Sequence, residues 1–61
     1  MRFELSRAEA DLLRDVLEAA ARERQHQIHH ADSRPFRQRL EAEAAIIEAI
    51  RFKLEREITV A

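Results

Sequence analysis

Asp32-Ser33-Arg34-Pro35 is the stretch that decides the fold of this chain. It contains the only proline among the 61 residues, and the sequence has no glycine. Pro35 suits the first turn of a helix, where Asp32 or Ser33 can act as the N-cap, and the proline disfavours the α conformation at Arg34. The stretch therefore predicts a sharp turn from which a new helix starts.

The segments on both sides of the turn have the composition of helices. Residues 6–9, with the sequence Ser-Arg-Ala-Glu, form a capping box, in which the serine and glutamate side chains each accept a backbone amide proton. Good helix formers follow, and they resume after the turn. We predict one all-α domain over residues 1–61, a two-helix antiparallel hairpin with a helix at about 6–30, a turn at 31–34 and a helix at about 34–57.

The two ends of the chain give a weaker signal. Residues 2–5 and 57–60 alternate polar and apolar side chains, which is compatible with a small strand pair at the open end of the hairpin. Two strands of this length are marginal by themselves, so frayed ends or an extended helix are the expectation.

The apolar residues form more stripes than one hairpin can cover. In the second helix they follow a 4-3-4 spacing, typical of a coiled-coil seam, and in the first helix they form two stripes about 80° apart. Only one of those two stripes can face the second helix. The residues that we expect to form core or dimer contacts are Leu12, Leu13, Val16, Leu17, Ile28, Phe36, Leu40, Ile47, Ile50 and Leu54.

The position of the turn also predicts how the helices align. It pairs residues whose numbers add up to about 67, as in an αα-hairpin with a short connection. Val16 then lies opposite Ile50 inside the hairpin, and Arg24 lies opposite Glu43. An ion pair between Arg24 and Glu43 would fix this alignment. The alternative is that both side chains extend to water.

These patterns predict self-association. A chain of this length without cysteine has no disulfide or thiolate metal site to stabilise it, and the uncovered stripe favours a homodimeric four-helix bundle. Residues 22–39, at the turn end, contain five arginines against Glu23 and Asp32, whereas the rest of the chain has six basic and ten acidic residues. An antiparallel homodimer, with the two turns at opposite ends, would place each basic turn beside an acidic open end.

Composition narrows the classes of function. With 11 basic and 12 acidic residues, the chain has no general attraction to nucleic acid or to an anionic membrane. No stretch is apolar enough to span a bilayer, and the first residues do not resemble a signal peptide, so we expect no membrane partner and a cytoplasmic location.

The sequence also lacks the signatures of an enzyme. It has no cysteine nucleophile and no glycine-rich phosphate loop, so we expect no enzymatic activity, no catalytic residue and no cofactor. We expect the carboxylates of Glu41, Glu48 and Glu55 to pair with arginines on the helix surface, such as Arg37 and Arg51.

His26, His29 and His30 form the cluster with the best spacing for a metal. His26 and His30 are four residues apart, which lets two imidazoles chelate one ion, and Glu23 lies one turn earlier as a candidate third ligand. A polar helix end at which histidines suit the helix dipole is the simpler interpretation, and a pH-sensitive interface is a third.

Two aromatic residues have alternative roles. Arg34, Arg37 and Arg39 surround Phe36, so this end could contact phosphates while the ring stacks on a base. Because Phe36 also begins the apolar stripe of the second helix, packing is the favoured interpretation and nucleic-acid binding the alternative. Phe52 lies away from that stripe, where it is either an ordinary exposed aromatic or a docking point for another protein.

Residues 28–40, with the sequence IHHADSRPFRQRL, resemble a pattern found in short bacterial proteins of unknown function. That pattern has a capped helix, an Ile-x-x-(Thr/Ala)-Asp-Ser turn, and Phe-Arg-x-x-Leu at the start of a second helix. The resemblance implies a bacterial helical hairpin and no particular activity or functional residue. At the level of the fold alone, the hairpin is similar to the plasmid RNA-binding protein Rop, a dimer of αα-hairpins. We expect a structural or protein-interaction module that binds a second copy of itself, with a further protein partner left open.

Overall fold

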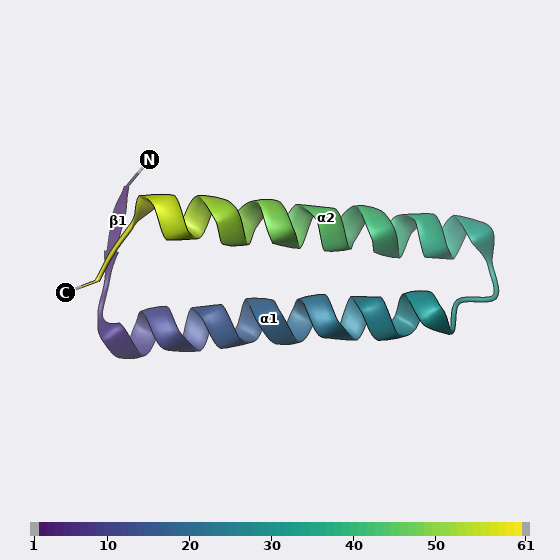
Figure 1. Ribbon diagram of the computed structural model, residues 1–61, viewed down its shortest axis with the longest axis horizontal. Helices are drawn as coiled ribbons and strands as arrows, with labels where there is room; N and C mark the ends of the chain where they lie inside the picture. Colours follow the sequence, from purple (N-terminus) through teal and green to yellow (C-terminus); the bar gives the residue numbers. More distant parts are fainter. Residues whose placement is uncertain (1, 61) are drawn as a thin grey trace.

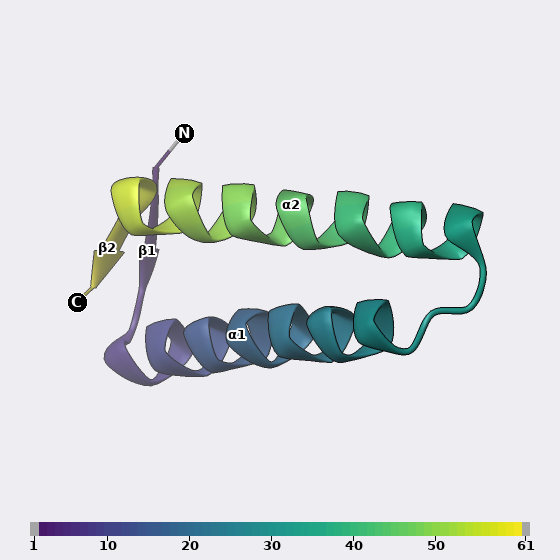
Figure 2. The same cartoon turned by 45° about the vertical axis from the view of Figure 1, so that its right-hand side comes forward.

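The computed structural model describes residues 2–60 as a helical hairpin with a small strand pair at its open end (Figures 1 and 2). Strand β1 (Phe3–Leu5) leads into helix α1 (Arg7–His29), and helix α2 (Arg34–Glu57) leads into strand β2 (Ile58–Val60). The predicted helical hairpin is confirmed. The two helices lie side by side in one layer, and the Cα trace measures 44 × 20 × 9 Å.

The start of α1 is fixed by the predicted capping box. The Ser6 hydroxyl accepts a hydrogen bond from the Glu9 amide at 3.1 Å, and the Glu9 carboxylate accepts one from the Ser6 amide at 2.8 Å. Two backbone donors that have no partner within the helix are satisfied in this way.

The turn between the helices is built without glycine. At the end of α1 the amides of His30 and Ala31 donate to carbonyls three residues earlier, at 3.1 and 3.3 Å. Ser33 is the N-cap of α2, where its hydroxyl accepts the Phe36 amide at 3.4 Å, and Pro35 lies in the first turn. Within residues 2–60 no residue has a positive φ, so the turn contains no conformation that would need glycine.

The ends of the chain form strands, and the expectation of frayed ends or an extended helix was wrong. Residues 3–5 pair in parallel with residues 58–60. Ile58 has an extended backbone, with φ −77° and ψ 138°, so α2 stops before it. The pairing is parallel because both strands cross the open end in the same direction, from the α2 side towards the α1 side (Figure 2), and the two helices form the crossover connection between them. Arg2 Nε also donates to Thr59 Oγ1 at 3.3 Å.

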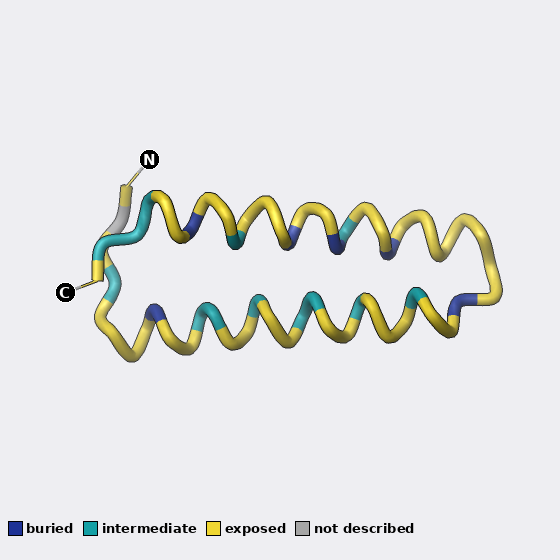
Figure 3. Tube along the Cα trace, viewed as in Figure 1, coloured by how far each residue is buried: buried dark blue, intermediate teal, exposed yellow. Residues whose placement is uncertain are grey.

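The core is a narrow seam between the helices. In Figure 3 the buried and half-buried residues follow the inward side of each helix, and the outward sides are exposed. No large side chain in the described part of the chain is completely buried. The buried apolar residues, half of which are alanines, are Ala10, Ala31, Leu40, Ala44, Ile47 and Leu54.

Part of the predicted seam lies outside this core. Val16 and Ile50, which we predicted to face each other inside the hairpin, are both exposed, and so is Phe36. A 4-3-4 spacing repeats every 3.5 residues, whereas an α-helix turns every 3.6 residues, so a strict heptad stripe drifts around a helix that does not supercoil. Ala44 occupies an inward position that the prediction did not include.

Candidate interaction surfaces

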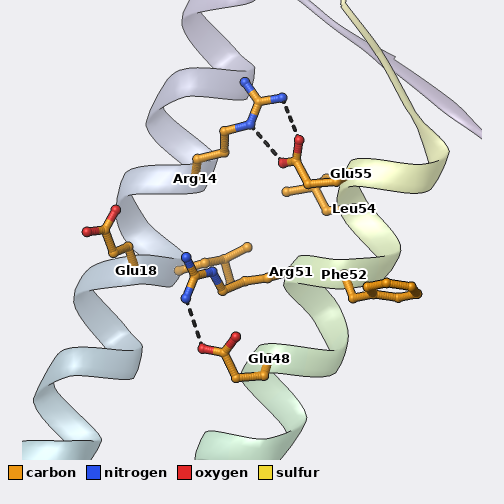
Figure 4. Close-up of a pocket in the computed structure, with 8 residues that line it drawn as sticks. Arg14, Glu18, Glu48, Arg51, Phe52, Leu54 and Glu55 are labelled. Atoms are coloured by element: carbon orange, nitrogen blue, oxygen red, sulfur yellow. Dashed lines mark hydrogen bonds and ion pairs between the residues drawn. The ribbon is translucent and has the colours of Figure 1, made fainter.

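Charged side chains of both helices line an open cleft on one face of the hairpin (Figure 4). Arg14 of α1 donates two hydrogen bonds to the carboxylate of Glu55 in α2, from Nε at 2.8 Å and from Nη2 at 2.9 Å. Arg51 donates to Glu48 on the same helix at 2.9 Å, and Glu18 of α1 lines the same open cleft. We call these five residues the ion-paired face.

The contact between Arg14 and Glu55 shifts the ionisation of both groups. The hydrogen bond from Arg14 lowers the pKa of Glu55, and the same bond raises the pKa of the Arg14 guanidinium. Both side chains are about half exposed, so water screens their attraction and the pair adds only modestly to stability. Its two-point geometry nevertheless links the open ends of the two helices in one alignment.

We did not predict this cross-hairpin pair from the sequence. We expected Glu55 to pair on its own helix, as Glu48 does with Arg51. The numbers of Arg14 and Glu55 add up to 69, close to the predicted pairing rule. The alignment of the helices was therefore the signal that could have identified the pair.

Of the two alternatives for Arg24 and Glu43, the structure shows the ion pair. Arg24 Nε lies 3.2 Å from a carboxylate oxygen of Glu43, and both side chains are partly buried. Arg24 also donates to the carbonyl of Ala20 at 3.2 Å, and Arg39 approaches Glu43 at 3.4 Å. This cluster fixes the alignment of the helices towards the turn, as Arg14 and Glu55 do at the open end.

The opposite face of the hairpin contains an apolar groove. Its walls combine Leu13 and Leu17 of α1 and Ile50 and Leu54 of α2 with three charged residues of α2, which are Lys53, Arg56 and Glu57. Arg14 and Glu55 each follow a groove leucine by one residue, which places them about 100° further around their helices. Residues displaced around the helix axis in the opposite direction from Leu13 and Leu54 therefore lie on the groove side.

Four large apolar side chains on the groove side of the hairpin are exposed to solvent, and one of them, Ile50, lines the groove itself. Leu12 is 65% exposed, Val16 55%, Ile46 58% and Ile50 45%. Around its helix axis, each of these residues lies within about 100° of a leucine that lines the groove, on the side of that leucine away from Arg14 and Glu55. Large exposed apolar residues gathered on one side of a small protein make that side a candidate interaction surface. We call the groove and these four residues the apolar face.

The ten predicted core or dimer residues divide into three groups. Leu40, Ile47 and Leu54 are buried; Leu13, Leu17 and Ile28 are half-buried; Leu12, Val16, Phe36 and Ile50 are exposed. The hairpin therefore covers one of the two stripes of α1 and leaves the other open. The buried alanines were missed because alanine favours a helix whether or not it is buried.

Two of the three turn-end arginines already contact the protein itself. Arg37 Nη2 donates to the carbonyl of Ala31 at 3.0 Å, and Arg39 pairs with Glu43. Arg34 and Arg37 also line a shallow polar pocket together with two acidic residues, Asp32 and Glu41. These carboxylates weaken the attraction of this end for phosphate groups, and nucleic-acid binding stays a prediction.

The histidines lie close together without completing a metal site. The ring centroids of His26 and His30 are 4.6 Å apart, with the ring planes inclined at 57°. Within residues 2–60 no three histidine, cysteine, aspartate or glutamate side chains are arranged to hold a metal ion. The structure thus brings the two predicted imidazoles together and does not join Glu23 to them.

Phe52 is exposed and points away from α1 (Figure 4). The guanidinium carbon of Arg56 lies 5.6 Å from the centre of its ring, a cation–π contact within α2. Phe52 therefore lies outside the apolar face and has a partner on its own helix.

Comparison with known proteins gives no relative. No protein-family model matches the chain, and neither the curated proteins nor the solved structures include a match. In the described part of the chain, neither helix combines the length and the apolar character needed to cross a membrane.

Proposed function

We propose that this protein is a self-associating interaction module whose working form is an antiparallel homodimeric four-helix bundle. The hairpin is a single layer of two helices, whereas a stable domain normally packs at least two layers around its core. A second hairpin would supply the missing layer. The partner proposed first is therefore another copy of this chain.

The main support for a homodimer is the large solvent-exposed surface area of the hairpin. The chain exposes 4951 Å², whereas a compact monomer of 7.2 kDa exposes about 4100 Å². The excess of roughly 850 Å² is close to the ~800 Å² that each partner buries in a standard protein–protein interface. One hairpin thus has enough surplus surface for one stable contact with a second.

The distribution of charge supports an antiparallel arrangement. The five arginines in residues 22–39 lie towards the turn, and ten of the twelve acidic residues lie outside that range. Turns at opposite ends would bring each basic turn beside the acidic end of its partner. Turns at the same end would bring like charges together, which is unfavourable at separations below a Debye length of about 8 Å.

Sedimentation equilibrium tests the dimer. From low to high micromolar concentration, we expect the mass to approach twice the 7.2 kDa of one chain. Helicity measured by circular dichroism should increase over the same range, because association stabilises the fold by mass action. A fully helical monomer at high micromolar concentration would contradict the proposal.

Spin labels test the orientation, since the chain has no cysteine of its own. In the antiparallel dimer, labels on Asp32→Cys in the turns should be separated by close to the 44 Å length of the hairpin. Labels on Ala45→Cys, near the middle of α2, should give similar distances in either orientation and serve as the control. Turn labels as close together as the middle labels would indicate turns at the same end.

A further inference from the structure

The two faces of the hairpin differ in how well they can be covered by another protein. The ion-paired face already satisfies its charges within the chain, through the bonds from Arg14 to Glu55 and from Arg51 to Glu48. Covering these charges would remove their hydration without providing new partners, and that desolvation is costly. The ion-paired face is therefore the more favourable of the two faces to leave exposed to solvent.

The apolar face has the opposite character. Leu12, Val16, Ile46 and Ile50 present large side chains to solvent around the groove. The groove has a volume of about 490 Å³, is open to solvent and lies in the half of the hairpin next to the strand pair. Burying apolar surface stabilises association by about 25 cal/mol per Å². Covering this side buries four large exposed apolar side chains. Lys53, Arg56 and Glu57 also line the groove, so their charged groups must remain at the solvent-facing edge of the contact.

We infer that the second copy docks on the apolar face, with the apolar faces of the two hairpins against each other, while the ion-paired face and Phe52 stay in water. This inference rests on the proposed homodimer and adds which surface forms its interface. The excess exposed area of one hairpin is close to the area that one partner buries in a standard interface, so covering one face is sufficient.

The positions of the exposed residues fit a two-fold symmetric contact. Ile46 lies at the middle of α2, and Val16 lies within two residues of the middle of α1. In an antiparallel homodimer the symmetry axis passes through the middle of the hairpin, so each residue meets the same region of the partner. Ile46 and Val16 then pack near the axis, while the turn-end and open-end charges face each other at the periphery.

Matched charge substitutions test the choice of face. Ile50→Glu and Phe52→Glu both place a glutamate at an exposed position of α2, on the apolar face and off it respectively. We expect Ile50→Glu to weaken dimerisation at least 100-fold and Phe52→Glu to change it less than threefold, by sedimentation equilibrium. A dimer that survives Ile50→Glu but is lost with Phe52→Glu would overturn the inference and leave the proposed homodimer standing.

A second measurement applies even if the charged variant does not fold. Val16→Cys places a thiol of similar size on the apolar face, and Ala45→Cys places one at an exposed position off it. The rate of thiol labelling at Val16→Cys should fall at least tenfold between low and high micromolar protein, and the rate at Ala45→Cys should stay constant. Equal protection at both positions, or none at either in a dimeric protein, contradicts the inference. A wild-type protein that remains a folded monomer refutes the homodimer as well.

Discussion

Arg34 and Arg37 lie one helical turn apart at the start of α2, yet they differ in what they contact. The Arg37 guanidinium donates to the Ala31 carbonyl and so connects α2 to the turn, whereas the Arg34 side chain makes no hydrogen bond or ion pair within residues 2–60; both residues are exposed. We expect Arg37→Ala to lower the free energy of unfolding by about 1 kcal/mol. Arg34→Ala should stay within about 0.5 kcal/mol of wild type. Urea unfolding followed by circular dichroism measures both, and equal effects would mean that the Arg37 contact has no structural role.

The pair formed by Arg14 and Glu55 predicts a specific dependence of stability on pH. Because the hydrogen bond from Arg14 favours the carboxylate, the pKa of Glu55 is lower in the folded protein than in the unfolded chain. The resulting stabilisation is present above the unfolded pKa of about 4.3 and is lost as the pH falls through the folded pKa. Glu55→Gln should therefore lower the urea midpoint slightly at neutral pH and match wild type in strong acid.

The control for this experiment is Glu23→Gln, which removes an exposed carboxylate outside the cross-hairpin pairs. Its difference from wild type should not follow the pH profile of Glu55→Gln. If the effect of Glu55→Gln were the same at neutral and acidic pH, the ion pair would not be its source.

At the scale of elements, the start of α1 depends on its cap. Ser6→Ala removes the hydroxyl that accepts the Glu9 amide, and we expect it to reduce the free energy of unfolding by about 1 kcal/mol. Ser6→Asp supplies another acceptor and should retain most of that stability. Thermal unfolding of the two variants, compared at one protein concentration, checks the prediction; equal losses would show that the serine is needed for another reason.

The helices could be predicted from the sequence because their signals are local. Caps at Ser6 and Ser33 and the proline at the start of α2 act within one helical turn of where they occur. The strands carry no such signal. The alternating residues at the two ends were compatible with a strand pair, but segments of three residues are too short to favour it over frayed ends. Residues 3–5 and 58–60 have partners because the hairpin brings the two ends together.

At the scale of the whole molecule, the sequence showed that α1 has two apolar stripes, of which only one can pack against α2. It could not show which stripe the hairpin covers, because they differ by a rotation of about 80° that propensity and spacing do not distinguish. In the structure the Leu13 and Leu17 side of α1 faces α2, and the ion pair between Arg14 and Glu55 forms beside it. Leu12 and Val16 are then left on the side that we propose a second copy covers.

The strand pair brings both ends of the chain to the open end of the hairpin (Figure 2). This has a consequence for joining two copies genetically into one polypeptide. In the antiparallel bundle the open ends lie at opposite ends, so a connecting peptide must span close to the 44 Å length of the hairpin. At about 3.4 Å per extended residue, that requires at least about 13 residues. A bundle with both turns at one end would accept a tether of only a few residues, so the shortest tether that yields a compact tandem protein reports how the two hairpins are oriented.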